Sequence, residues 1–222
     1  MLIDTEINQL FIDFLKKRLI EPLPGLESQK HMAPTTAMDF FRSFKPTKTA
    51  HRSAVMVLLT EDAGKYNLLL TLRSKNISHS GQISFPGGRC ENGETIEEAA
   101  LRETFEETGI ETEKINIIGR LSDLFVPPSD NIITPVVGYA EKQLHIQANY
   151  KEVEEAFFVP LSKLLGNEFK KKEPWDFGGI EVTVPFWDIH PTTPLWGATA
   201  MILSEFIEIS GEFFQTSIKH EK

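Results

Sequence analysis

The sequence is poor in cysteine and lacks any long, uninterrupted apolar run. Cys90 is the single cysteine among 222 residues, which excludes an intramolecular disulfide and a cysteine-rich zinc site. No segment approaches the roughly 18 consecutive apolar residues of a membrane-spanning helix. The first twenty residues include three acidic side chains and hold no apolar stretch of signal-peptide length. From these absences we expect a cytoplasmic protein with no membrane partner.

Positive charge is also scarce. The chain has 23 lysines and arginines against 32 aspartates and glutamates, which gives a formal net charge of −9. Because nonspecific binding to nucleic acid needs a basic surface, we do not expect nucleic acid as a partner. A small anionic substrate stays compatible with this charge, since bound divalent cations can reverse its sign locally.

The first 50 residues are predicted to form an extension rather than an independent domain. In residues 4–19, apolar side chains that include Leu10 and Phe11 recur at the spacing of an amphipathic helix. Residues 22–36 contain three prolines and a glycine, which is typical of a loop. We therefore expect residues 1–50 to accompany a larger domain formed by residues 51–222.

Residues 51–222 are predicted to form one α/β domain. Short apolar segments between turn residues predict strands at 53–60, 67–73, 82–85, 115–125, 131–140, 154–161 and 180–189. A Thr-x-x-Glu capping box and a terminating Gly109 predict a helix over 96–108. A closing helix is predicted over 196–209. Strands with interspersed helices indicate a layered α/β fold.

The helix predicted over 96–108 carries a high density of like charge. A helical wheel with about 100° per residue places Glu103, Glu106 and Glu107 within one arc. Such neighbours repel by roughly 0.2–0.5 kcal/mol per pair. Leu101 and Phe105 fall on the opposite side, so we expect the helix to pack through them. A solvated acidic face would explain the pattern, and so would a site for Mg²⁺ or Mn²⁺, which prefer grouped oxygen ligands.

The spacing of the neighbouring residues favours the metal site. The positions that share this spacing are Gly88, Glu94, Arg102, Glu103, Glu106, Glu107 and Gly109. This pattern matches the Nudix box, and chance would produce it about once in 10⁵ sequences or less often. Thr104 departs from the family, which usually has an aliphatic residue there. From about residue 53 to about residue 208, the sequence resembles a Nudix hydrolase.

The resemblance implies a mixed-sheet α/β/α sandwich that hydrolyses nucleoside diphosphates linked to another group. The metal ligands it implies are Glu103, Glu106 and Glu107, with the carbonyl of Gly88 nearby. The catalytic residues it implies are Glu103, Glu106 and Arg102, with the arginine orienting carboxylates. The scaffold residues of the box are Glu94 and Gly109. The general base stays open between Glu103 and a later acidic residue, for which the candidates are Glu152, Glu154 and Glu155.

The segment before the box, "LLLTLRSKNISHSGQISFPGG", resembles the signature of the coenzyme A diphosphatases in this family, and so does "PLWGATAMIL". A second arginine of that signature is absent. The resemblance implies that coenzyme A or acyl-CoA is cleaved to 3′,5′-ADP and (acyl-)4′-phosphopantetheine. A 3′-phosphate needs cations away from the metal site, and the sequence offers Arg73, Lys75 and His79.

Two other functions remain open at this stage. One is a Nudix pyrophosphatase for ADP-ribose, a dinucleotide or a nucleoside triphosphate, and the other is a non-catalytic nucleotide-sensing module. The chain keeps all four box glutamates and shows no basic recognition helix in its first 50 residues, which favours catalysis. The expected partners are a small nucleotide substrate and, as an option, a second copy of the chain.

Overall fold

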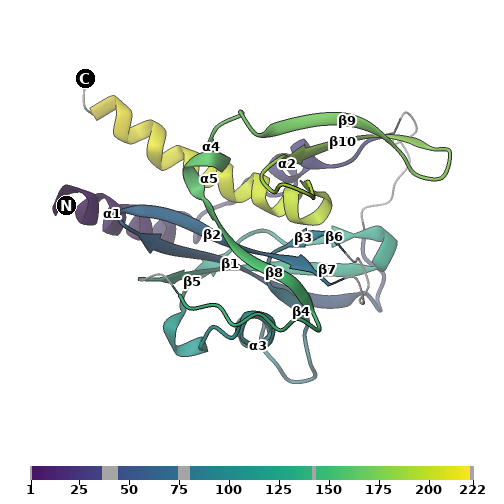
Figure 1. Ribbon diagram of the computed structural model, residues 1–222, viewed down its shortest axis with the longest axis horizontal. Coiled ribbons are helices and arrows are strands. Elements are labelled where there is room, and N and C mark those ends of the chain that lie inside the picture. The colour runs from purple at the N-terminus through teal and green to yellow at the C-terminus, as the bar shows by residue number, and fades with distance from the viewer. Residues whose placement is uncertain (1, 37–44, 75–80, 142–143, 221–222) are drawn as a thin grey trace.

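The computed structural model describes residues 2–36, 45–74, 81–141 and 144–220, with the backbone alone for 2–8 and 216–220. A main sheet lies at the centre, with α3 (Ile96–Thr108) against one face and α5 (Gly197–His220) against the other (Figure 1). A small second sheet lies beyond α5, on the side away from the main sheet. These layers confirm the predicted α/β/α architecture.

The main sheet contains eight strands and mixes both pairing directions. The five strands of its continuous path lie in the spatial order β3 (Ile83–Ser84), β2 (Lys65–Arg73), β1 (His51–Asp62), β7 (Asn131–Ala140) and β5 (Asn116–Arg120). The other three are β4 (Gly87–Arg89), which pairs with β1, β6 (Leu124–Val126), which pairs with β7, and β8 (Val153–Pro160), which pairs with β2. Strand β1 runs parallel to β7 and antiparallel to β2, so the predicted mixed sheet is confirmed.

The apolar core lies on both faces of the main sheet. Along β1, Val57 and Leu59 are fully buried in the larger cluster, which also contains residues of α1 and α5. Met56 and Leu58 point the other way, into a smaller cluster with Ala99 of α3. Alternate residues of a strand face opposite sides, so a strand covered on both faces is apolar nearly throughout. The sequence "AVMVLL" of β1 reflects this double burial.

The second sheet covers α5 with three strands, β9 (Lys170–Asp176), β10 (Glu181–Trp187) and β11 (Leu195–Trp196). Strand β10 corresponds to the strand predicted at 180–189. Strand β9 was not predicted, because "KKKEPWD" shows no apolar alternation and six of its seven residues are exposed. Its backbone pairs with β10 along its whole length, so tertiary pairing overrides its weak local preference.

Within the described residues, the remaining helical elements outside the N-terminal extension are short. They are α4 (Leu161–Leu165), the 3₁₀ turn η3 (Thr112–Lys114) after α3, and the 3₁₀ turn η4 (Pro127–Ser129) between β6 and β7. Among the helices that the structure describes, none combines the length and apolar character needed to cross a membrane.

The N-terminal helix α1 (Leu2–Arg18) packs into the core beside α5. Phe11 and Leu15 are fully buried, and the Phe11 ring lies 5.2 Å from the ring of Phe213 on α5. The predicted apolar face is wrong at Leu10, which is 59% exposed. The apolar stripe is therefore rotated toward Phe11 and Leu15, the side that meets α5.

The segment predicted as a loop over 22–36 contains two helical turns, α2 (Leu26–Gln29) and the 3₁₀ turn η1 (Lys30–Met32). A buried carboxylate of α5, that of Glu205, holds this segment in place. Its oxygens accept hydrogen bonds from Gly25 N at 2.9 Å, Gln29 Nε2 at 3.0 Å and Ser122 Oγ at 2.6 Å. The extension is thus tied to the core by apolar packing and by hydrogen bonds to a buried acid.

Candidate active site

Local signals at both ends position the acidic helix α3. At its start, the Thr95 hydroxyl accepts a hydrogen bond from Glu98 N at 3.2 Å, and Thr95 N donates to the Glu98 carboxylate at 2.8 Å. At its end, Gly109 adopts the left-handed conformation with φ 69° and donates its N–H to Phe105 O. The helix predicted over 96–108 is confirmed, with the capping box and the glycine stop formed as expected.

The face through which α3 packs agrees with the prediction only in part. Leu101 is half-buried and packs against the smaller core cluster, as predicted, whereas Phe105 is 51% exposed. The buried side chains of the helix are instead Ala99, Ala100, Thr104, Glu107 and Thr108. Small side chains let the helix approach β1 and β4 closely, and the two threonine hydroxyls donate to helix carbonyls four residues earlier at 2.6 Å. The carboxylate face therefore turns toward the sheet.

Three carboxylates converge where α3 meets the turn before β8. The ligand oxygens of Glu103, Glu107 and Glu152 all lie within 4.8 Å of one another. Two of these residues are predicted metal ligands, and Glu152 is one of the three later acids considered as general base. Glu106 is not in this cluster: its side chain is 45% exposed and accepts from Arg102 Nη1 at 3.1 Å.

The backbone of β4 makes room for the cluster. A Cβ atom added at Gly88 would lie 2.4 Å from Oε1 of Glu103, closer than carbon and oxygen can approach. Only glycine therefore allows the Glu103 carboxylate to lie against this strand. The proposed role of the Gly88 carbonyl as a metal ligand stays a prediction.

Without a bound cation, burial makes the ionised carboxylates of the cluster energetically unfavourable. Glu107 is 3% exposed, and its Oε2 is a buried atom that lacks a hydrogen-bond partner within the described structure. Burial raises the pKa of Glu107 to about 8, although the nearby Arg73 guanidinium opposes this rise. Burial also raises the pKa of Glu103, against the opposing effect of Arg102. An unpaired, buried carboxylate oxygen beside two further carboxylates fits the oxygen ligands that Mg²⁺ or Mn²⁺ requires.

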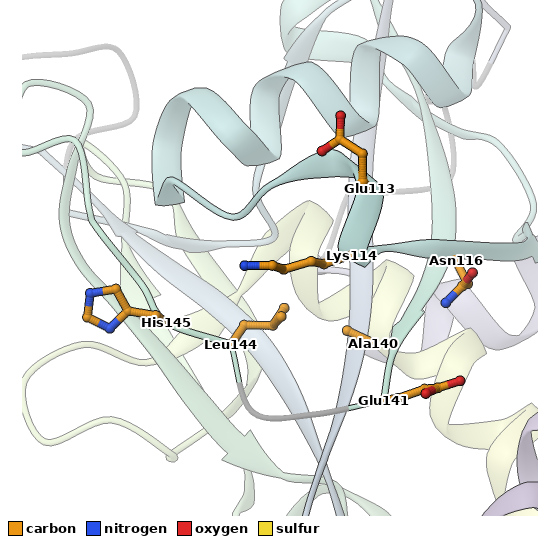
Figure 2. A pocket seen from close by; sticks show the side chains of 7 residues that line it. All are labelled: Glu113, Lys114, Asn116, Ala140, Glu141, Leu144 and His145. Atoms are coloured by element: carbon orange, nitrogen blue, oxygen red, sulfur yellow. The ribbon is translucent and has the colours of Figure 1, made fainter.

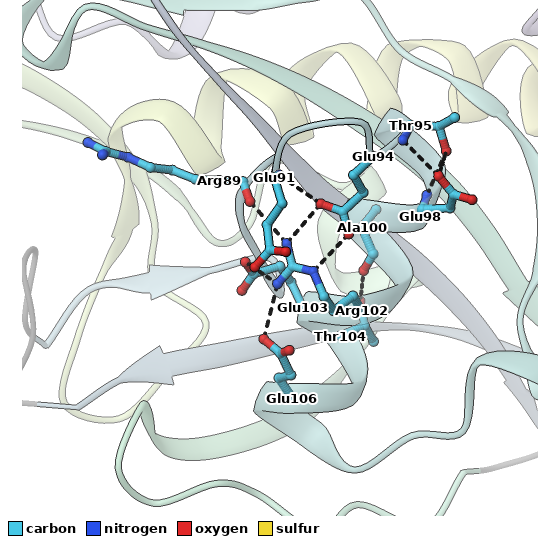
Figure 3. A network of polar contacts seen from close by, with 10 residues as sticks. All are labelled: Arg89, Glu91, Glu94, Thr95, Glu98, Ala100, Arg102, Glu103, Thr104 and Glu106. Atoms are coloured by element: carbon cyan, nitrogen blue, oxygen red, sulfur yellow. Dashed lines mark hydrogen bonds and ion pairs between the residues drawn. The ribbon is translucent and has the colours of Figure 1, made fainter.

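Arg102 organises the acidic residues around the cluster (Figure 3). Its guanidinium binds both oxygens of Glu94, through Nε at 2.8 Å and Nη2 at 3.0 Å, and Nη2 also donates to Arg89 O. Nη1 donates to Glu103 Oε1 at 2.9 Å and to Glu106. These bonds lower the pKa of Glu94 and raise that of Arg102. Arg102 thus holds one oxygen of Glu103 in a fixed direction, as charge-assisted bonds do.

Of the three predicted substrate-binding cations, Arg73, Lys75 and His79, the structure describes Arg73. Arg73, at the end of β2, places Nη1 3.8 Å from Glu107 Oε1, so it does not lie away from the metal site as expected. Its location suits contact with a phosphate bound at the cluster. Lys75 and His79 lie outside the described residues.

The three later candidate bases, Glu152, Glu154 and Glu155, lie in different surroundings. Glu152 joins the cluster, and Asn149, which no sequence motif marks, donates to its Oε1 at 3.1 Å. Glu154 is exposed, and Glu155 pairs with His190 at 3.2 Å. An asparagine in a turn gives no recognisable sequence signal, since turn asparagines commonly bond to their own backbone.

A separate hollow of about 540 Å³ lies near the C-terminal end of α3 (Figure 2). Its lining residues are Glu113, Lys114, Asn116, Ala140, Glu141, Leu144 and His145. Charges of both signs surround it, and it contains neither a cluster carboxylate nor Arg73. The convergent carboxylates, rather than this hollow, therefore define the candidate active site.

The fold and this site define the class of protein. Residues 50–180 match the NUDIX domain, and the chain belongs to the Nudix hydrolase family. A MutT/nudix family protein from Enterococcus faecalis has the same fold, with a TM-score of 0.50 and 17% identity over 79% of this chain and 70% of that one.

Relatives narrow the comparison further. The chain is 28% identical over 230 residues to Nudix hydrolase 3 of Caenorhabditis elegans, covering 94% of this chain and 90% of that protein. It is 32% identical over 155 residues to a mitochondrial coenzyme A diphosphatase of Homo sapiens. That match covers 68% of this chain and 65% of the human protein. The similarity to the human protein agrees with the resemblance to coenzyme A diphosphatases.

Proposed function

We propose that this Nudix hydrolase uses Mg²⁺ or Mn²⁺ to cleave the pyrophosphate of coenzyme A or acyl-CoA. The observation that carries the proposal is the convergence of Glu103, Glu107 and Glu152 beside Arg73. Carboxylates that hold cations, with an arginine next to them, suit a substrate with several phosphate oxygens. The choice of coenzyme A rests on the segment before the box and on the similarity to a relative of that name.

In this proposal, Glu103, Glu107 and Glu152 hold the cations, and Arg73 binds an oxygen of the pyrophosphate. A bound divalent cation neutralises phosphate oxygens and lowers the pKa of a water that it binds. Water adds to one phosphorus, the bridging P–O bond breaks, and the two products are 3′,5′-ADP and 4′-phosphopantetheine. The proton lost by the water goes to a carboxylate oxygen of the cluster that holds no cation, and the two candidate bases there are Glu103 and Glu152.

The substrate is tested by offering coenzyme A and ADP-ribose side by side and identifying the products by mass spectrometry. We expect coenzyme A to be the better substrate by kcat/KM and to give 3′,5′-ADP and 4′-phosphopantetheine. Dephospho-coenzyme A, which lacks the 3′-phosphate, should be poorer. A clear preference for ADP-ribose, a dinucleotide or a nucleoside triphosphate would refute coenzyme A and leave the family unchanged. Tight binding without any turnover would favour the sensing module.

The catalytic residues are tested by charge-neutral variants. Glu103→Gln should lower kcat by about 10²–10⁴-fold, the usual contribution of a general base, with further loss if the cation is also lost. Glu111→Gln, an exposed acid just after the helix, is the matched control and should retain full activity. Full turnover by Glu103→Gln, or by the wild type in excess EDTA, is incompatible with the proposal.

The cellular location and the assembly state remain predictions. The human relative is named a mitochondrial enzyme, so similarity gives no support to the cytoplasmic location expected from the sequence. A homodimer stays an option, to be measured by light scattering on the purified protein.

A further inference from the structure

The turn before β8 is attached directly to the last turn of α3. Gln147 N donates to Thr108 O at 2.8 Å, and Asn149 N donates to Glu107 O at 2.9 Å. The final carbonyls of a helix have no partners within the helix and need donors from elsewhere. These two bonds therefore satisfy carbonyls at the end of α3 and place the turn beside the helix that carries Glu103 and Glu107.

Asn149 then holds Glu152 by its backbone and its side chain together. Its carbonyl accepts from Glu152 N and Val153 N, both at 2.9 Å. Its side-chain Nδ2 donates to Glu152 Oε1 at 3.1 Å, and its Oδ1 accepts from Lys151 N at 3.3 Å. One residue therefore links the main chain of Glu107 to the carboxylate of Glu152.

We propose that Asn149 is a positioning residue, which fixes the Glu152 carboxylate as the third oxygen ligand of the cation site. The inference rests on the metal dependence in the proposed function but not on coenzyme A as substrate. The unpartnered, buried Oε2 of Glu107 is the independent sign that a ligand belongs here.

The chemistry of the side chain suits this task. Asn149 bonds Oε1 of Glu152 at 3.1 Å, and a carboxylate has two oxygens, so this single amide bond does not occupy both. A lysine or arginine at position 149 would bring a positive charge and compete with the cation, whereas a neutral amide orients the carboxylate without that penalty. Hydrogen-bond partners of metal ligands commonly change metal affinity by about 10–100-fold when removed.

The test is the affinity of the full chain for Mn²⁺ in the absence of substrate, measured by electron paramagnetic resonance or calorimetry. Asn149→Ala keeps the backbone bond to Glu107 and removes the amide, so we expect Mn²⁺ affinity to fall by about 10–100-fold. Gln147→Ala is the matched control: it belongs to the same segment and its bond to Thr108 comes from the backbone, so affinity should be unchanged.

A double-mutant cycle separates positioning from general destabilisation. If Asn149 acts through Glu152, then Glu152→Gln should weaken Mn²⁺ binding, and adding Asn149→Ala should cause little further loss. Additive losses, or an Asn149→Ala variant that binds Mn²⁺ like the wild type, would overturn the inference. Circular dichroism and thermal melts confirm that each variant is folded. A preference for ADP-ribose in the substrate panel would refute coenzyme A and leave this cycle intact, whereas a wild type without Mn²⁺ affinity would overturn both proposals.

Discussion

At the scale of single residues, the role of Glu107 could be predicted from the sequence, but its burial could not. Its spacing from Gly88 and Glu103 marks it as a metal ligand by resemblance. Its burial depends on the approach of β4 and of the turn at Asn149, which lie far from it in the sequence. For the same reason, the sequence could not select Glu152 from the three acids in "EVEE" or exclude Glu106 from the cluster.

Glu107 also predicts how the metal-free protein responds to pH. Its folded pKa of about 8 lies above the ordinary value of 4.5, so the protonated acid favours the folded state. This contribution is fully present below pH 4.5 and is lost as the pH rises toward 8. In EDTA, the free energy of unfolding should therefore lose up to roughly 1.4 kcal/mol per pH unit across this window through Glu107.

Urea unfolding at several pH values measures this effect. Glu107→Gln removes the titrating group and should flatten the dependence, whereas Glu111→Gln, which is exposed, should leave it unchanged. Saturating Mn²⁺ should reverse the trend, since cation binding requires the ionised carboxylate. A wild type and a Glu107→Gln variant with identical pH dependence in EDTA would contradict the buried location of this acid.

At the scale of elements, local signals predicted the ends of α3, whereas tertiary contacts determine its packing face and the existence of β9. The capping box and Gly109 gave both ends of the helix correctly, because each acts through neighbouring backbone groups. The predicted packing face was right at Leu101 and wrong at Phe105, because the helix meets the sheet mainly through small buried residues such as Ala99 and Ala100. Strand β9 escaped prediction because its only strand-like feature is its pairing with β10.

The junction between α3 and the following turn can be tested at Gly109. A Cβ atom there would lie 2.9 Å from Gln147 Cβ, and φ is already 69°. Gly109→Ala should therefore cost about 1–2 kcal/mol of stability for the left-handed backbone, plus the cost of displacing the turn. Displacing this turn should also weaken Mn²⁺ binding, since Glu152 follows it.

Gly93→Ala provides the matched control for this variant. Its φ of 87° brings comparable backbone strain, but nothing lies within 4 Å of the added Cβ. By chemical denaturation, Gly93→Ala should lose less stability than Gly109→Ala. By Mn²⁺ titration, Gly93→Ala should bind Mn²⁺ with wild-type affinity. Equal effects on Mn²⁺ binding at the two glycines would refute the coupling between the helix end and the cation site.

At the scale of the whole molecule, the extension is part of the core. Phe11 packs between α5 and the main sheet, with its ring 4.9 Å from that of Tyr66, and Glu205 bonds Gly25 and Gln29. We keep the prediction that the extension contributes no catalytic group. A chain that starts near residue 45 would expose this apolar surface and remove two donors from a buried carboxylate, so we expect it to be strongly destabilised.

Two point variants on α1 give a cleaner test than truncation. Phe11→Ala should lower the free energy of unfolding by about 3–5 kcal/mol, as for other buried aromatic residues, yet keep kcat below its melting temperature. Leu10→Ala, on the exposed side of the same helix, should stay within about 0.5 kcal/mol of the wild type. A folded Phe11→Ala variant without activity would contradict the prediction that the extension has no catalytic role.

The most direct measurement of the central claim is anomalous X-ray diffraction from crystals soaked in Mn²⁺. We predict a peak enclosed by the carboxylates of Glu103, Glu107 and Glu152, with ligand oxygens roughly 2 Å from the ion. Glu106 should stay on Arg102, outside that coordination sphere. A peak bound by Glu106 without Glu152, or no peak at the cluster in crystals of active enzyme, would contradict the site described here.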